Sequence, residues 1–575
     1  MTNCNKLLFF ALAAILLSCN NSKTKTDEKS DVEITKLEGS QVLYLNETDE
    51  AQNIFPHSVV DLITSNISNH VFEGLVKFNP KDLSVNPCLA EKWTIDSTRK
   101  VYVFTLRNDI YFQNDECFAD GKGRKITAQD FVYSFELLCS NSAFNQSFSS
   151  TFKDLVKGAN AYFEASKNGK PNFSLEGVKA INENTLQITL ERVDRSFLQI
   201  LCSVPTSVIA KEAFAKYGEK CSVGSGPFVY KKLESENKVA LIKNPSYYLK
   251  DKAGKNLPYL DSIVISFNAN QLEELKLFKE KQLDIVNSGL PIKSINEFLA
   301  SEMESFQSKN AKYIMELSPN MSTQFYVFNT AKKPFNNIKL RQAISYAIDR
   351  DKIVAEVLNG QATNAGFYGI VPACFKNYKT TSVKGYNLDI KKAKKLLAEA
   401  GYPNGKGLEP IQLKLNSGGS RNTLVALEIQ KQLKNNLNID LEFEIMPLSS
   451  KIEAEKKGEG DMFRTAWIAD YPSPISFFPL AYSKHVPAKT TEPSYPNTSR
   501  FKNESFDKLY EEALLAADDN IANDLLVKAD QILMNEAPVL ILWYDQNFKL
   551  VQSSVKNYFF NPMDYRNCTE VYIKK

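Results

Sequence analysis

The stretch IQLKLNSGGSRNTLVALEIQKQLKNNLNIDLEFEI, Ile411 to Ile445, decides the expected fold class. It begins and ends with alternating apolar runs, IQLKL and LEFEI, which are typical of half-buried strands. Between them lies a helix around Thr423 to Leu433. In LEFEI, Leu441, Phe443 and Ile445 alternate with two glutamates, as in a strand with one solvated face. The order strand, helix, strand predicts a β–α–β unit and an α/β domain.

Just downstream, the stretch TAWIADYPSP, Thr465 to Pro474, carries an apolar strand up to a carboxylate, Asp470, and then breaks it with two prolines. The strand is expected to add to the same sheet. From these ten residues alone the simplest interpretation of Asp470 is a turn former, because an aspartate side chain can bond the backbone two residues on.

Upstream, the chain likewise alternates between segments with the apolar spacing of a helix and segments with the apolar spacing of a strand. Apolar residues recur at helical spacing between Lys339 and Gly360, which is able to end the run, and again between Asp389 and Pro403. Thr127 is the expected N-cap residue for a helix in the stretch 125–138. The first part of the chain is richer in strands: Gln41–Leu45, Lys100–Leu106 and Leu186–Leu190.

Composition limits the function classes. A chain of 575 residues is too long for one core and predicts two or three domains. Its net charge of +3 is small for this length and no basic stripe stands out, which argues against a nucleic-acid partner. With three histidines and no CxxC pair, the chain has no convincing zinc constellation. Neither a metal nor a cofactor is expected. An odd number of cysteines follows Cys19, so not all can pair; a disulfide between Cys202 and Cys221 is one option.

The N-terminus is a targeting element. Lys6 precedes an eleven-residue apolar run, Leu7 to Leu17, which is too short for a permanent membrane-spanning helix. The sequence LLSC that ends in Cys19 resembles the lipobox of bacterial lipoproteins, in which the cysteine is acylated and becomes the new N-terminus. A plain signal peptide cut nearby is the alternative. The polar segment after Cys19 has the composition of a tether. We expect a signal peptide at 1–18, a lipid-anchored tether at 19–36, and a protein exported to the cell envelope, periplasmic or on the outer face of a membrane.

Several blocks, in this order, resemble the family of extracytoplasmic solute-binding proteins that feed oligopeptide and dipeptide ABC transporters. Any one block is weak evidence, whereas the ordered set is specific and runs from about Gln41 to the C-terminus. The blocks include SNISNHVFEGLVKFNP (Ser65–Pro80), GRKITAQDFVYSF (Gly123–Phe135), GSGPFVYKKL (Gly224–Leu233), FNTAKKPFNNIKLRQAISYAIDRDKIV (Phe328–Val354), WIADYPSP (Trp467–Pro474) and APVLILWYDQNFKLV (Ala537–Val551).

The resemblance implies an α/β fold of three domains, a periplasmic-binding-protein clamshell whose two mixed-sheet lobes are joined by hinge strands. Domain I would be discontinuous, covering 37–72, 206–320 and 546–575. Domain II, an insertion, would cover 73–205, and domain III would cover 321–545. The ligand would lie between domains I and III, which close over it by hinge motion.

The resemblance also implies the site. In peptide-binding members, the aspartate of a motif similar to WxADYxxP meets the α-ammonium of the peptide, and here Asp470 and Tyr471 fill that motif. Trp467 would form an apolar wall for a ligand side chain, although a core tryptophan would look the same. Arg464 would meet the peptide C-terminal carboxylate, or is a surface arginine. Val60 and Leu62 match the segment whose backbone pairs with the peptide as an added strand.

The sequence also departs from the family pattern. The family commonly has Asp-Pro-His where this chain has Phe55, Pro56 and His57. Asp545 stands where an aromatic residue is frequent, and EIMPLSS (Glu444–Ser450) lacks an aromatic common before the anchor motif. Peptide length and sequence preference therefore do not follow from the resemblance.

The expected function is a monomeric substrate-binding lipoprotein without enzymatic activity, which captures short peptides and delivers them to the permease subunits of an ABC importer. The same fold could instead bind a nickel chelate, haem, an oligosaccharide or an opine. A secreted hydrolase is a weaker alternative, because GSGPF is not a GxSxG nucleophile elbow. A chaperone or signalling role without a transporter is left open by the sequence.

Overall fold

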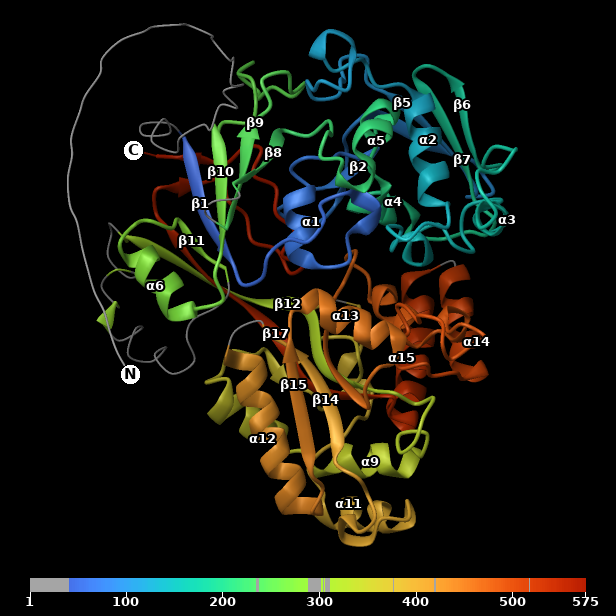
Figure 1. Ribbon diagram of the computed structural model, residues 1–575, viewed down its shortest axis with the longest axis vertical. Helices are drawn as coiled ribbons and strands as arrows, with labels where there is room; N and C mark the ends of the chain where they lie inside the picture. Colours follow the sequence, from blue (N-terminus) through green and yellow to red (C-terminus); the bar gives the residue numbers. More distant parts are fainter. Residues whose placement is uncertain are drawn as a thin grey trace, which may run out of the picture. The chain divides into compact units, whose positions relative to one another are not determined.

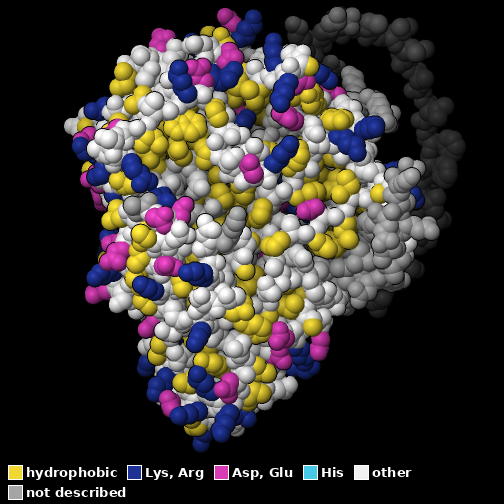
Figure 2. Space-filling model, turned by 180° about the vertical axis from the view of Figure 1, so that it is seen from behind, with side chains coloured by type: hydrophobic (Ala, Val, Ile, Leu, Met, Phe, Trp, Pro, Cys, Tyr) yellow, Lys and Arg dark blue, Asp and Glu magenta, His cyan; other side chains and the backbone are white. Residues whose placement is uncertain are grey.

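The structure is a computed structural model that describes residues 41–233, 237–287, 301–302, 305, 311–375, 377–417, 420–516 and 518–574. The expected signal peptide, the tether and Cys19 lie outside these residues. Within them, no helix combines the length and apolarity needed to cross a membrane. On the face seen in Figure 2, lysine and arginine side chains are interspersed with acidic ones, in keeping with the small net charge.

The first sheet, named the β1 sheet, has four strands in the order β1-β10-β9-β8. β1 pairs parallel with β10 in a register that sets Leu43 opposite Ile263, and the other pairs are antiparallel. The predicted strand at 41–45 is confirmed as β1. The strands of this sheet are β1 (Val42–Glu47), β8 (Phe228–Leu233), β9 (Lys238–Lys243) and β10 (Ser262–Phe267).

A second, antiparallel sheet, named the β5 sheet, has the order β4-β5-β7-β6 and carries α2 (Ala128–Leu138) against one side. The predicted N-cap is confirmed: Thr127 forms a capping box with Asp130, which satisfies donors at the start of the helix. The two predicted strands at 100–106 and 186–190 are confirmed as β5 and β7. The strands are β4 (Ala90–Ile95), β5 (Val101–Leu106), β6 (Val178–Asn182) and β7 (Thr185–Thr189).

The third sheet, named the large sheet, has seven strands with the main order β11-β17-β12-β16-β14-β15. The predicted β–α–β unit is confirmed: β14 and β15 pair in parallel and α12 (Ser420–Leu437) connects them. The predicted solvated face of LEFEI is confirmed, since Glu442 and Glu444 are exposed, but the apolar face is only partly buried: Ile445 is 46% exposed on β15, the edge strand. The strands are β11 (Ile285–Val286), β12 (Tyr313–Phe328), β13 (Asn364–Ala365), β14 (Ile411–Asn416), β15 (Leu441–Met446), β16 (Met462–Ile468) and β17 (Val539–Gln552).

Two sequence expectations fail locally. The helical run predicted from Lys339 to Gly360 is interrupted: α9 (Ile338–Ala347) ends, Ile348 is extended, and Asp349 caps a new short helix by accepting from the Lys352 amide at 3.0 Å. The Cys202–Cys221 disulfide is not formed.

The Cys202 and Cys221 side chains are both buried free thiols. The Cys202 thiol donates to the carbonyl of Leu198 at 3.4 Å, and that of Cys221 donates to the carbonyl of Val223 at 3.9 Å. Each thiol is therefore directed to its own local backbone.

The long strands β12 and β17 connect the part of the molecule that holds the β1 sheet to the part that holds α9 and α12 (Figure 1). Their pairing is irregular between Pro319 and Thr323, next to the predicted boundary at 320/321. Asn320 on β12 donates to Asn547 on β17 at 2.6 Å across this irregularity. We call the stretch of these two paired strands that passes from one part of the molecule to the other the crossing of β12 and β17. The irregular pairing makes this stretch the natural place for a hinge.

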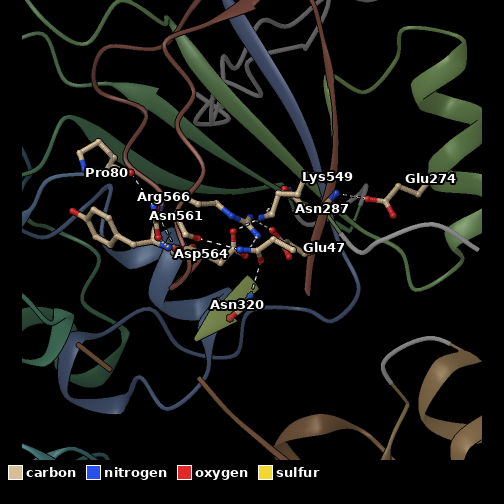
Figure 3. A network of polar contacts seen from close by, with 12 residues as sticks. Glu47, Pro80, Glu274, Asn287, Asn320, Lys549, Asn561, Asp564 and Arg566 are labelled. Carbon is tan, nitrogen blue, oxygen red and sulfur yellow. Dashed lines mark hydrogen bonds and ion pairs between the residues drawn. The ribbon is translucent and has the colours of Figure 1, made fainter. Parts of the chain in front are cut away.

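A buried ion network lies beside this crossing (Figure 3). Asp564 pairs with both Lys549 and Arg566, and Arg566 pairs in turn with Glu47 on β1. Burial alone would raise the pKa of Asp564, but the charges of Arg566 and Lys549 lower it to about 2. The network therefore ties the C-terminal segment to β1 and β17 by charges that compensate one another.

His57 lies in an aromatic cluster near the start of the chain. It is fully buried, its ring contacts Phe55 edge-on with centroids 5.3 Å apart, and Phe55 also contacts Phe144 and Phe214. Neither ring nitrogen of His57 has a hydrogen-bond partner among the described residues. Burial lowers the pKa of His57 to about 3, because nothing in this apolar environment stabilises the charged ring.

Replacing His57 with leucine is expected to stabilise the protein more at pH 4.5 than at pH 7.5. Below a pH of about 6.5 the unfolded chain binds a proton on His57 that the folded protein excludes, so stability is lost as the pH falls toward 3. Two pH units correspond to about 2 to 3 kcal/mol in the free energy of unfolding. Urea unfolding of both proteins at both pH values measures the difference. Phe144→Leu, in the same cluster, is the control that should show no pH-dependent difference.

Candidate functional site

A cavity of about 360 Å³ lies where the large sheet meets the segments from 59–69, 146–151 and 200–205. Its volume is within the range of small-ligand sites. All six residues that the sequence predicts for the ligand site line it: Val60, Leu62, Arg464, Trp467, Asp470 and Tyr471. The structure therefore brings together residues that are about 400 positions apart in the sequence.

β16 delivers the anchor motif to this cavity. The strand ends at Ile468, although the Ala469 amide still donates to the carbonyl of Met321 on β12 at 2.9 Å; Pro472, which has no N–H, follows three residues later. The Asp470 amide donates to the Ser476 hydroxyl at 2.8 Å, which fixes the backbone at the end of the strand. The Asp470 side chain is thereby left free to project from a rigid element.

The Asp470 carboxylate is exposed to the cavity. In the part of the chain that the structure describes, it makes no hydrogen bond and no ion pair. The turn interpretation requires a bond from this carboxylate to the backbone N–H two residues on, but that residue is Pro472, which has no N–H to donate. Burial within the surrounding protein raises the pKa of Asp470 to about 7. A positive group that enters the cavity would find an uncompensated acceptor here.

Arg464 supplies a positive group on the same strand. Its guanidinium donates to the side-chain carbonyls of Gln324 and Asn416, the latter at 3.2 Å. No carboxylate of the described residues pairs with it directly; Asp545 instead pairs with Arg421 at 3.2 Å. Burial and, next, the charge of Arg421 lower the pKa of Arg464 to about 10.

Two aromatic residues line the cavity near Asp470. Trp467 is half-buried and donates its indole N–H to the carbonyl of Ser476 at 2.9 Å, while its ring faces Tyr495 with centroids 6.5 Å apart. Tyr471 is buried, and burial raises its pKa well above the usual range. These rings provide apolar area beside a charged group, which suits a ligand with both kinds of surface.

The backbone segment predicted to pair with a peptide differs from expectation at Leu62. Leu62 is the first residue of α1 (Leu62–Ser68), because Asp61 caps the helix by accepting from the amide and hydroxyl of Thr64 at 2.8 and 2.7 Å. Only Val59 to Asp61 is extended. Among the described residues, nothing hydrogen-bonds to the backbone N–H or C=O of Val60, so these groups remain open to a ligand.

The sequence reasoning missed three charged residues of the cavity wall on α13 (Leu448–Lys457). Lys451 pairs with Glu455 at 2.7 Å, and both side chains are only 5% exposed. Glu455 also accepts from the hydroxyls of Thr465 and Thr498 at 2.9 and 2.7 Å. Lys456 lies over the ring of Tyr495 at 5.0 Å. In the sequence, a lysine and a glutamate four residues apart are typical of a solvated helix face. Nothing in the sequence therefore distinguished these buried residues from an exposed pair.

A family model described as bacterial extracellular solute-binding proteins, family 5 Middle, matches residues 84–487. The protein belongs to this family. As a family 5 solute-binding protein it has a solute-binding role, and its relatives are periplasmic or extracellular binding proteins. The family consists of binding proteins and not of enzymes.

Full-length relatives and solved structures agree with this assignment. The periplasmic oligopeptide-binding protein OppA of Escherichia coli is 28% identical over 591 residues, covering 100% of both chains. The periplasmic binding protein DppA from Helicobacter pylori, in complex with the peptide STSA, superposes with a TM-score of 0.80 at 23% identity, covering 94% of this chain and 100% of that one.

The murein tripeptide-binding protein MppA of Escherichia coli superposes with a TM-score of 0.79 at 24% identity, covering 93% of this chain and 99% of that one. Its unliganded open form superposes with a TM-score of 0.61, at 23% identity. These likenesses confirm the predicted three-domain clamshell fold. The domain boundaries remain predictions.

Replacing Lys451 with methionine in this family 5 protein is expected to cost about 3 kcal/mol in the free energy of unfolding, because it leaves the Glu455 carboxylate buried without its positive partner. Chemical denaturation measures the change. Lys508→Met is the matched control: Lys508 and Glu512 have the same spacing in α14 (Glu504–Leu515), but their side chains are 76% and 46% exposed, so the cost should be below about 1 kcal/mol. Equal costs for the two variants would contradict the buried pair.

Proposed function

We propose that this protein captures short peptides in the cavity and delivers them to a membrane permease of an ABC importer. The observation that carries this proposal is one cavity that holds a carboxylate, Asp470, and a guanidinium, Arg464, neither of which has an oppositely charged partner among the residues that the structure describes. A free peptide is a zwitterion whose ammonium and carboxylate match these two groups. The names and ligands of the relatives support the same class of solute.

Asp470 would set the register of the bound peptide. Every unblocked peptide has one α-ammonium in the same place, whatever its side chains. At about 4 Å and an effective dielectric constant near 20, the ion pair is worth roughly 4 kcal/mol before desolvation is subtracted. The net gain is smaller, but the first residue of any peptide would bind at Asp470.

The spacing of the two charged groups limits the length of a ligand that uses both. Arg464 and Asp470 are six residues apart on β16 and its continuation, a span of at most about 20 Å. An extended peptide of about six residues covers the same span. Pairing of the peptide backbone with the open N–H and C=O of Val60 would be indifferent to side chains, so many sequences could be accepted.

Export and anchoring are part of the proposal. The LLSC sequence supports acylation of Cys19, which would keep the binding protein at the membrane surface where its permease lies. Mass spectrometry of the N-terminal peptide from membranes tests this: the expected result is a diacylated or triacylated Cys19. An unmodified N-terminus at another residue would contradict the anchor.

Replacing Asp470 with asparagine is expected to weaken binding of free peptides at least tenfold, because the amide keeps the shape of the side chain but carries no charge for the ammonium. Titration calorimetry with a mixed pool of di- to hexapeptides measures this. N-acetylated peptides should bind the wild type weakly and lose nothing further on Asp470→Asn. If acetylated and free peptides bind equally, Asp470 is not the anchor.

Two controls sharpen this test. Asp440→Asn removes an equal charge from a side chain that is 60% exposed and paired with Lys434, away from the cavity, and should leave affinity unchanged. Arg464→Gln should instead reduce binding of peptides with a free C-terminus and have little effect on C-terminal amides. Binding of haem, a nickel chelate or an oligosaccharide by the wild type, with no binding of peptides, would overturn the peptide assignment.

Peptide affinity is expected to be highest between about pH 7 and 8. Burial raises the pKa of Asp470 to about 7, so below that pH the free protein carries a neutral acid that must lose its proton before an ammonium can bind. Affinity should therefore fall by up to about tenfold for each pH unit below 7. Above about 8 the peptide α-amino group loses its charge. Calorimetry from pH 5 to 9 measures the profile, and Asp470→Asn should abolish its acidic limb.

A further inference from the structure

The segment 194–196 lies between β7 and α4 (Phe197–Ile200). It lies where the part of the molecule that holds the β5 sheet meets the part that holds the large sheet, a boundary that we call the rim. On one side it is attached to the β5 sheet, since the ring of Phe197 packs against that of Tyr102 on β5 with centroids 4.8 Å apart. Asp194 is held within the segment by an ion pair with Arg192 at 3.1 Å and by accepting from the Ser196 amide at 2.8 Å. The segment therefore moves with the β5 sheet.

Arg195, in the middle of this segment, reaches across to the part that holds the large sheet. Its guanidinium donates to the backbone carbonyl of Ala516 at 2.8 Å and pairs with the carboxylate of Asp519. Ala516 is the residue that ends α14, and Asp519 begins α15 (Asp519–Glu536). A positive group at the C-terminus of a helix is favoured by the helix dipole. Arg195 thus fastens one part of the molecule to a helix end of the other.

Other contacts reach across the same rim. Lys153 donates to the carbonyl of Lys484 at 3.2 Å, and Lys456 on α13 donates to the side chain of Gln146 at 2.7 Å. Ser196 contacts the side chain of Tyr471, the residue next to Asp470. In Figure 1, α14 and α15 lie next to the region of α3 and α4. The rim contact therefore continues directly into the wall of the ligand cavity.

We propose that the segment 194–196 is a closure latch, with Arg195 as its positioning residue. The inference rests on the proposed capture of peptides by hinge closure. When the two parts separate about the crossing of β12 and β17, Arg195 must leave Ala516 and Asp519, because these partners belong to the opposite part. When a peptide ammonium binds Asp470, Tyr471 is held in place against Ser196, and the latch forms beside it. The segment 194–196 thereby retains the ligand although it does not itself line the cavity.

A latch that forms only in the closed protein affects the rate at which the peptide leaves and not the rate at which it enters. Arg195→Gln is therefore expected to raise the peptide dissociation rate about tenfold, equivalent to about 1.4 kcal/mol, while the association rate changes less than twofold. Asp519→Asn should have a smaller effect in the same direction, because the bond from Arg195 to the Ala516 carbonyl remains. The melting temperature of each unliganded variant should equal that of the unliganded wild type. A merely structural role for Arg195 would instead change the melting temperature.

Stopped-flow measurement of peptide binding and release, with small-angle scattering of the same samples with and without peptide, tests the proposal. Lys167→Gln is the matched control: it removes one positive charge from the same region, but within the described residues the ion pair of Lys167 is local, to Glu164 three residues earlier on α3 (Ala159–Ser166). If wild type and Arg195→Gln release peptide at the same rate as Lys167→Gln, the latch is wrong although peptide capture stands. If the wild type binds no peptide, the proposed function itself is wrong, and this result differs from the one that contradicts the latch alone.

Discussion

A carboxylate that has no positive partner among the described residues of its own chain is the constraint on which the ligand cavity depends. Asp470 can occupy this position only because the rest of the molecule holds it there. β16 lies inside the large sheet between β12 and β14, so its end is rigid, and the bond from the Asp470 amide to Ser476 fixes the last backbone unit. A flexible loop would let the carboxylate turn toward water or a nearby cation, and the cavity would lose its selectivity for charge.

Local patterns were sufficient to predict the elements of the large sheet and the arrival of Asp470 at a strand end. The alternation in IQLKL and LEFEI and the helix between them are properties of short segments, and short segments are what periodicity describes. Leu62 is helical and not extended because Asp61 caps α1, and an aspartate three residues before a threonine is a readable signal of such a cap.

Other features had no signal in the sequence. Lys451 and Glu455 have the spacing of an exposed pair, and only the packing of α13 against Thr465 and Thr498 makes them buried. Arg195 and Asp519 are separated by 324 residues, so their contact follows from how the parts of the fold meet and not from any local pattern. The ordered family blocks supplied what periodicity could not, namely that Val60 and Asp470 would line one cavity.

The ion network of Glu47, Lys549, Asp564 and Arg566 has a consequence for how the chain matures. Glu47 lies on β1, the first strand of the described residues, and Arg566 is 519 residues further along the chain. Each charge is buried, so each is costly until its partner arrives. A polypeptide that crosses a membrane starting from its N-terminus cannot neutralise Glu47 until nearly the whole chain has been translocated. Because these two charges are 519 residues apart, the Glu47–Arg566 pair forms late, and the part of the molecule that holds the β1 sheet is completed only when both segments are present.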